Sequence, residues 1–186
     1  MRMAPPAGVA VLMLLVLTRF HGDAWPHLRK DRCSPPGETL VETLSLLRNV
    51  GSAFPSECHS ANVTLPRNIS ANHVQCSPAL RLVHELLRGV GLVFDEQEPS
   101  LGMGGVLWDE RKLDDFQNLL YQVLDHPCFL QMNSDSSGIL DQYFSDITTL
   151  IQRQDVCGWY VLRRDLLWTL RTSLRKHHVC YSWSHL

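Results

Sequence analysis

Apolar side chains recur at every third or fourth position through most of this 186-residue chain, and this spacing places them along one face of an α-helix. No stretch alternates apolar and polar residues convincingly, as a half-buried strand would. The pattern therefore predicts an all-α fold with five helices. One of them carries an apolar stripe from Leu140 to Ile151 and begins at an N-cap at Ser136 or Ser137. The other four have these approximate bounds: 37–51, 78–92, 107–125 and 156–179.

Local signals predict where the second helix begins and where the third helix ends. Ser77 is a good N-cap for the second helix, and Pro78 follows in the first helical position, where its missing N–H costs nothing. Pro127 predicts the end of the third helix, since proline disrupts a helix interior.

The connection between the first two helices, from about Ser52 to Cys76, is far longer than antiparallel neighbours need. A connection of this length can carry the chain from one end of a bundle to the other, so the first two helices can run parallel. The sequence therefore predicts an up-up-down-down four-helix bundle of the cytokine type, with a fifth helix and disulfide bonds.

The first two dozen residues predict a secretory signal peptide. Arg2 precedes an apolar run over 8–17, and small residues precede a cut after Ala24. Ten apolar residues are too few to span a bilayer, so we expect no membrane insertion. Residues 25–186 are then a single secreted, extracellular domain. The chain's net charge of −2 also argues against a nucleic-acid partner.

Six cysteines lie in the expected mature chain, and an even number in an oxidising compartment indicates disulfides. Six cysteines allow fifteen connectivities, and their spacing alone does not choose among them. Two glycosylation sequons, at Asn62 and Asn68, agree with the secretory route.

Three segments together resemble the C-terminal helices of type I interferons. Residues 108–131 contain Trp-Asp-Glu, Leu-Tyr-Gln-x-Leu and Cys-x-x-Gln as in the family's third helix, and 143–148 resemble its fourth. Residues 157–163, Cys-Gly-Trp-Tyr-Val-Leu-Arg, are similar to the family's Cys-Ala-Trp-Glu-Val-Val-Arg. The resemblance covers 107–171 well and the N-terminal half only in layout.

The resemblance implies two disulfides, Cys33–Cys128 and Cys58–Cys157. Two further cysteines, Cys76 and Cys180, have no counterpart in the usual four-cysteine pattern. In an up-up-down-down bundle, the start of the second helix and the end of the last lie at the same end. The topology therefore predicts a third bridge between Cys76 and Cys180.

The resemblance also implies a function: bridging the two chains of a heterodimeric class II cytokine receptor, of the interferon alpha/beta type, to start JAK-STAT antiviral signalling. In the family, the long first connection and the last helix meet the high-affinity chain, and the second to fourth helices meet the other. Trp168 and Leu167 stand among arginines off the core face, which is a typical hot-spot composition. Alternatively, Trp168 packs under the long connection. The expected receptor contacts are His59, Arg163, Arg164, Leu167, Trp168 and Arg171.

Some positions depart from the family. His59 and Asn62 stand where mammalian members have an apolar and a basic contact, and Asp141 and Gln142 replace basic residues. These departures favour a non-mammalian receptor pair, and we expect a monomer.

Other interpretations of the sequence are a metal site, an enzyme and two further classes of secreted protein. His177, His178 and His185 with Cys180 could form a metal cluster, but the expected disulfide competes for the cysteine. No motif of an enzyme, and so no catalytic residue or cofactor, is expected. Two alternatives remain open: another helical cytokine of the type III interferon kind, and a secreted carrier that holds an apolar ligand in an internal cavity above ~300 Å³.

Overall fold

The computed structural model of the protein describes residues 33–61, 63–66, 75–132, 138, 140–153 and 155–184. The described helices are α2 (Gly37–Asn49), η1 (Ser56–Ser60), α3 (Cys76–Glu96), α4 (Glu110–Leu124), α5 (Pro127–Leu130), α6 (Asp141–Arg153), α7 (Asp155–Lys176) and η4 (His178–Cys180). Extended pairing within the described residues is limited to isolated bridges. The prediction of an all-α fold is confirmed.

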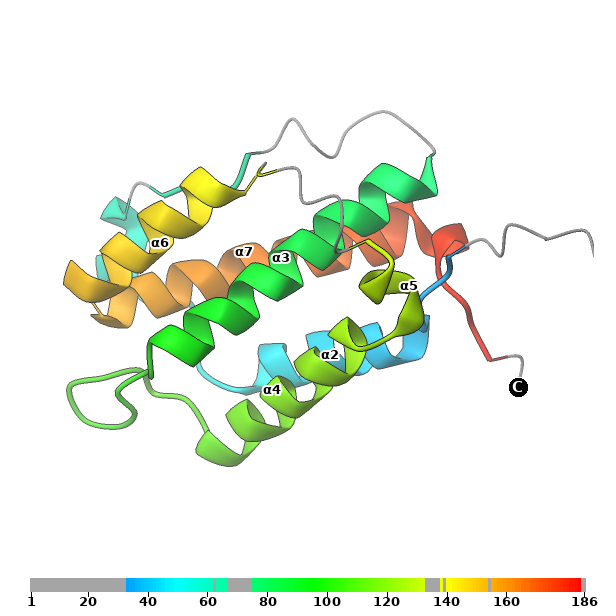
Figure 1. Cartoon of the computed structure of the whole chain (residues 1–186). Coiled ribbons are helices and arrows are strands. Elements are labelled where there is room, and N and C mark those ends of the chain that lie inside the picture. The colour runs from blue at the N-terminus through cyan, green and yellow to red at the C-terminus, as the bar shows by residue number, and fades with distance from the viewer. Residues whose placement is uncertain are drawn as a thin grey trace, which may run out of the picture. The chain divides into compact units, whose positions relative to one another are not determined.

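Helices α2, α3, α4 and α7 form a four-helix bundle. Both α2 and α3 pack against α4 and against α7, while α6 lies against α7 and α3. In Figure 1, α2 and α3 run in one direction and α4 and α7 in the other, and α6 adds a fifth helix along one side. The up-up-down-down arrangement predicted from the long first connection is therefore confirmed.

Several helix boundaries differ from the prediction. Helix α3 begins at Cys76 after Gln75, which makes no side-chain capping bond, so Ser77 is not the N-cap. Helix α4 begins at Glu110, because the carboxylate of Asp109 accepts the Lys112 N–H at 3.0 Å and caps the helix there.

Of two other predicted helix ends, the end of α4 agrees with the structure and the end of α7 does not. Pro127 does follow the end of α4, but it also opens the short helix α5, where the ring nitrogen of His126 accepts the Cys128 N–H at 3.3 Å. Helix α7 ends at Lys176, three residues earlier than predicted, and the chain continues into η4. The predicted N-caps of α6, Ser136 and Ser137, lie outside the described residues.

The helical stripes meet in one apolar core. Trp159 is fully buried, stacks on Phe94 at 4.9 Å between ring centroids and meets Trp108 edge-on at 6.2 Å. Phe116 and Leu120 of α4 are fully buried as well. Burying a side chain of this size stabilises the fold by ~1.5–3 kcal/mol, so these stripes supply much of the driving force for assembly.

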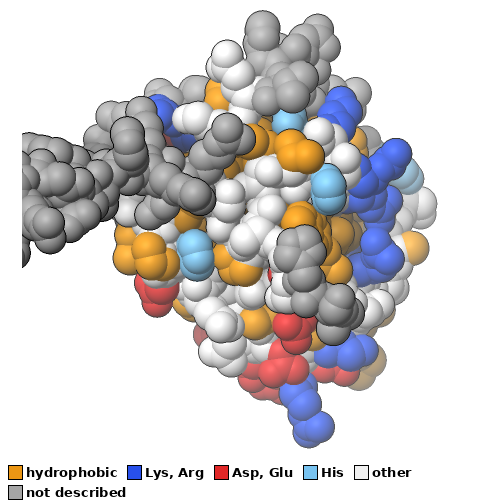
Figure 2. Space-filling model, turned by 90° about the vertical axis from the view of Figure 1, so that its right-hand side faces the viewer, with side chains coloured by type: hydrophobic (Ala, Val, Ile, Leu, Met, Phe, Trp, Pro, Cys, Tyr) orange, Lys and Arg blue, Asp and Glu red, His pale blue; other side chains and the backbone are white. Residues whose placement is uncertain are grey.

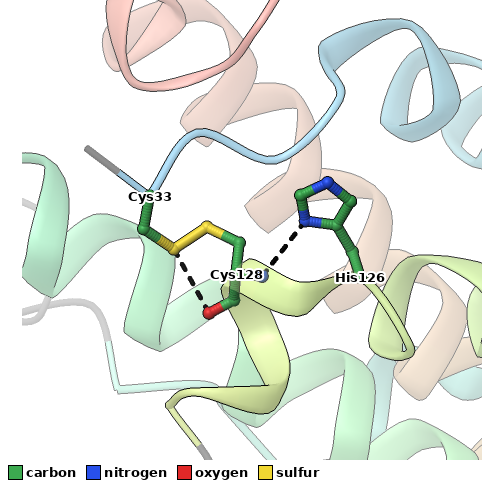
Figure 3. Close-up of a disulfide and its surroundings, with 3 residues drawn as sticks. All are labelled: Cys33, His126 and Cys128. Atoms are coloured by element: carbon green, nitrogen blue, oxygen red, sulfur yellow. Dashed lines mark hydrogen bonds between the residues drawn. A yellow bond between two sulfur atoms is a disulfide. The ribbon is translucent and has the colours of Figure 1, made fainter. Parts of the chain in front are cut away.

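The structure contains three disulfides, with the pairings that the sequence analysis expected. Cys33–Cys128 and Cys76–Cys180 have Cα–Cα distances of 5.0 and 5.2 Å, and Cys58–Cys157 has one of 5.1 Å. Figure 3 shows Cys33, just before α2, joined to Cys128 of α5, with its sulfur 3.2 Å from the Cys128 carbonyl oxygen. Cys58–Cys157 ties η1 to the start of α7.

The C-terminal segment returns to the start of α2. The Gly37 N–H donates to the Ser182 carbonyl at 2.8 Å, and the Ser182 N–H donates to the Pro35 carbonyl at 3.0 Å. Any Cβ at Gly37 would lie 2.7 Å from the Trp183 ring, so the close approach requires glycine there. Both ends of the described chain are thus held at one end of the bundle.

Candidate functional site

The first part of the connection after α2 is held in place by a single arginine of α7. The Arg163 guanidinium donates to four carbonyl oxygens: Leu47 at 2.9 Å, Arg48 at 2.7 Å, Gly51 at 3.0 Å and Ser52 at 2.7 Å. The last carbonyls of a helix have no partner within the helix, so this side chain satisfies the C-terminal end of α2.

The position of Arg163 differs from the role expected for it. From the sequence we expected it to contact the receptor, but Arg163 is only 8% exposed and its donors are directed at the backbone. Burial lowers the pKa of Arg163 from its usual value, without removing its charge at neutral pH. Arg163 is therefore a residue that shapes the loop, and it is not one of the receptor contacts proposed below.

Arg164, the next residue, holds a later part of the same connection. Its Nε lies 2.8 Å from the Asp165 carboxylate, and its Nη2 donates to the Val63 carbonyl at 3.3 Å. The guanidinium also lies 5.2 Å from the centroid of the Phe54 ring, within cation–π range. Because 40% of the side chain remains exposed, Arg164 both fixes the connection and faces outward.

Trp168 lies on the outer side of α7, next to this connection, and is 44% exposed. The alternative prediction, that Trp168 packs under the connection, is therefore not met in full. A groove of about 460 Å³ runs between α7 and residues 48–54, with Trp168, Leu167 and Phe54 supplying its apolar part. A smaller hollow also includes Trp168, and its other lining residues are Thr64, Leu65, Arg164 and Asp165.

Cations surround the apolar part of this groove. Its charged lining consists of Arg48, Arg163, Arg164 and Arg171, and no Asp or Glu lines it. We call this groove, which includes Trp168, the α7 groove. A half-exposed tryptophan surrounded by arginines is the composition that anchors protein interfaces, because the indole buries much area and the cations select an acidic partner.

The remaining expected site residues lie at or beyond the edge of the groove. His59 is exposed on η1, with its ring 5.3 Å from that of Phe54. The sequons at Asn62 and Asn68 lie outside the described residues. Sequence reasoning missed Arg48 and Phe54, although an aromatic residue in a largely polar connection was an available signal.

A second groove, of about 440 Å³, lies between α3 and α6 and shares no lining residue with the α7 groove. Its centre is apolar, with Leu92 51% exposed and Phe144 packed partly against the core. Arg88, Glu96 and Asp141 supply charge of both signs around it. We call it the α3–α6 groove.

Neither a metal centre nor a membrane span is found in the described part of the chain. No group of three or more His, Cys, Asp or Glu side chains there could hold a metal ion, and Cys180 is in a disulfide. His185 of the suggested metal cluster lies outside the described residues. No described helix is long and apolar enough to cross a membrane.

Four long helices in up-up-down-down order, a long first connection and an added fifth helix define a helical cytokine bundle. The model of the interferon alpha/beta domain matches residues 37–176. The chain therefore belongs to the interferon alpha/beta family, whose members are cytokines and not enzymes.

Two relatives show how far the similarity extends. Human interferon alpha-6 is 29% identical over 115 residues, a match that spans 55% of this chain and 58% of the human protein. The solved structure of zebrafish interferon 2 superposes with a TM-score of 0.59 at 23% identity, over 74% of this chain and 96% of that one. At this identity the zebrafish structure supports the fold alone.

Proposed function

We propose that the protein is a secreted antiviral cytokine that bridges the two chains of a class II cytokine receptor. Bringing the two chains together activates their attached kinases and so JAK-STAT signalling. Family membership supports a cytokine role, and the two separate grooves supply one contact surface for each chain. The protein acts by binding alone, as a monomer and without a cofactor.

The observation that carries this proposal is the half-exposed Trp168 in the cationic α7 groove. A tryptophan exposed in this way is costly to leave in water and gains most when a partner covers it. Arg164 and Arg171 favour acidic side chains around the apolar contact. We assign the high-affinity receptor chain to this groove, with His59 at its edge.

The second receptor chain is assigned to the α3–α6 groove. Exposed Leu92 offers an apolar contact, and Arg88 and Glu96 stand one helical turn to either side of it on α3. Because charge of both signs surrounds this groove, electrostatic attraction contributes less here, and we expect weaker binding than at the α7 groove.

The proposal includes the secretory features that lie outside the described residues. A cut after Ala24 releases residues 25–186, and three disulfides are consistent with folding in an oxidising compartment. Glycans at Asn62 and Asn68 would lie on the connection after η1.

The test compares Trp168→Ala with Leu130→Ala, since Leu130 is also about half exposed but lies on α5. Purified variants are titrated against the receptor ectodomains of the source species, and antiviral gene induction is measured in its cells. Loss of a hot-spot tryptophan costs at least ~2 kcal/mol, so we expect Kd for one ectodomain to rise about 30-fold or more. The Leu130 variant should bind and signal like the wild type.

Two results would contradict the proposal. One is the absence of gene induction by the wild-type chain in cells that respond to another interferon. The other is unchanged receptor binding by a Trp168→Ala protein whose far-UV circular dichroism and melting temperature match the wild type.

The two alternatives weighed from the sequence gain no support. The matched family model is the alpha/beta domain rather than a type III interferon. The α7 and α3–α6 grooves exceed the volume that a carrier requires, but both are surface grooves, with exposed Trp168 and Leu92 in their walls. Large side chains such as Trp159 and Phe116 fill the described interior of the bundle.

A further inference from the structure

The C-terminal half of α7 carries a row of exposed cations. Arg171, Arg175 and Lys176 are all exposed, and exposed His178 follows in η4. We call these three cations and the adjacent imidazole the cationic row. Positions 164, 168, 171 and 175 lie on one face of the helix, so the row continues the line of Arg164 and Trp168 over about 16 Å of helix axis.

Acidic residues are absent from this part of the sequence. Residues 166–184 contain no Asp or Glu, although the whole chain has a net charge of −2. Glu38, which approaches the C-terminal segment, uses its carboxylate to accept the Ser184 N–H at 2.5 Å. Figure 2 shows Lys and Arg side chains gathered along one side of this end of the bundle and acidic side chains gathered elsewhere.

The cations of the row are not used inside the molecule. Within the described residues, the side chains of Arg171, Arg175 and Lys176 have no carboxylate within 4.0 Å and donate no hydrogen bond. Burial, followed by the neighbouring charge of Lys176, lowers the pKa of His177. Since Arg171 and Arg175 are four residues apart on a helix, they also repel one another.

The helix dipole accounts for only part of this charge. Cations in the last turn of a helix are favoured, which applies to Arg175 and Lys176. The effect fades within that turn, so it does not explain Arg171. A row of unpaired like charges that continues beyond the last turn indicates an anionic partner.

We propose that the cationic row binds a sulfated polysaccharide, through Arg171, Arg175, Lys176 and His178. Such a chain is an extended polyanion, and its regularly spaced sulfates match exposed guanidinium and ammonium groups arranged in a line. The affinity arises from charge neutralisation and counterion release, so it falls steeply with salt. This site lies beyond the apolar centre of the α7 groove.

The surroundings of the row favour this partner over other polyanions. Single-stranded nucleic acid is bound by exposed aromatic side chains among the cations, but past Trp168 the aromatic residue beside the row, Trp183, is half-buried and stacks on His178. The three disulfides also fit an oxidising compartment, where sulfated polysaccharides are abundant polyanions.

The test uses heparin as the probe. The variant Arg175→Glu/Lys176→Glu changes two residues that do not line the α7 groove, so receptor binding is retained. We expect its affinity for immobilised heparin to fall at least tenfold. The control, Arg111→Glu/Arg153→Glu, makes the same change in net charge at exposed arginines of α4 and α6 and should bind heparin within twofold of the wild type.

A second variant, Arg175→Gln/Lys176→Gln, avoids placing acids at the helix C-terminus and should show a smaller loss in the same direction. Equal losses in the row and control variants, or no loss in either row variant, would overturn the proposal. So would tighter binding of the wild type to phosphatidylserine vesicles or to a single-stranded oligonucleotide than to heparin. Because heparin retention needs no receptor, failure here leaves the receptor proposal standing.

Discussion

Arg163 and Leu47 lie 116 positions apart in the chain, yet the Nε of one donates to the carbonyl of the other at 2.9 Å. Three further bonds from the same guanidinium reach Arg48, Gly51 and Ser52, so one side chain joins α7 to the end of α2 and to the connection that forms a wall of the α7 groove. The shape of the groove therefore depends on a residue that is itself buried and bonded to backbone carbonyls.

Replacing Arg163 should destabilise the fold. Hydrogen bonds from a charged group contribute ~1.5–3 kcal/mol each, but water can replace part of the set, so we expect Arg163→Ala to lower the free energy of unfolding by ~2–4 kcal/mol in a denaturant titration. Arg163→Lys should recover only part of this, because an ammonium cannot form the planar fork. Arg171→Ala, an exposed control on the same helix, should change it by less than ~0.5 kcal/mol. If Arg163→Ala also changed the free energy of unfolding by less than ~0.5 kcal/mol, Arg163 would not hold α2 and the connection in place.

The third disulfide offers a test of the bundle ends. Cys76 and Cys180 are 104 residues apart, and closing such a loop alone is worth up to ~4–5 kcal/mol in the chain-entropy model, less here because the three loops overlap. The variant Cys76→Ala/Cys180→Ala should fold but melt at a lower temperature. Non-reducing peptide mapping of the wild type should recover the Cys76–Cys180 peptide, and finding either thiol free would exclude the bridge.

Helix existence and direction were predictable because they depend on local spacing and connection length. The stripes of α2, α3, α4, α6 and α7 all appear in the core. Boundaries were less accurate because they depend on single side chains. Asp109 caps α4, so this helix begins later than the predicted residue 107. Helix α3 continues to Glu96, beyond the predicted residue 92, because Val93 and Phe94 still pack on the core.

The site was predictable in composition but not in the role of each residue. Trp168 and Leu167 lie in the groove with Arg164 and Arg171, as their spacing on one helix suggested. The role of Arg163 depends on carbonyls more than a hundred positions away, which no local pattern reveals. One signal was available: Trp159, Arg163, Leu166 and Leu170 follow helical spacing, and all four are buried.

Alkaline pH should weaken the fold through two tyrosines, the buried Tyr143 and the exposed Tyr121. The Tyr143 hydroxyl donates to Asp165 at 3.2 Å, and burial, followed by the charge of Asp165, raises the pKa of Tyr143 well above its usual value. A hydrogen bond to Asp95 raises the pKa of Tyr121 to about 12. The unfolded chain ionises near pH 10 while the folded protein does not, so the stability from these groups is complete below pH 10 and is lost as the pH rises above it.

The variant Tyr143→Phe isolates one of these groups. It keeps the ring and removes the ionisable hydroxyl, so the decline of the unfolding free energy above pH 10 should become shallower by up to ~1.4 kcal/mol per pH unit. At neutral pH the lost hydrogen bond should cost only about 1 kcal/mol. Denaturant midpoints at a series of pH values measure both effects, and parallel curves for variant and wild type would show that Tyr143 does not contribute.

The two grooves should be separable by substitution if the protein bridges two receptor chains. Leu92 is 51% exposed in the α3–α6 groove, and Leu92→Arg places a charge there. The α7 groove is left intact, because Leu92 does not line it. This variant should bind the high-affinity ectodomain with unchanged Kd, yet induce antiviral genes at least tenfold less well. In excess it should inhibit the wild type, because it occupies one receptor chain without recruiting the other.

Leu130→Arg is the matched control, since Leu130 is also 51% exposed and lies on α5 outside both grooves. It should signal like the wild type. The complementary variant, Trp168→Ala, should fail to inhibit because it does not occupy the high-affinity chain. If Leu92→Arg and Trp168→Ala lost binding to the same ectodomain to the same extent, the grooves would serve one chain, and the assignment of one receptor chain to each would be wrong.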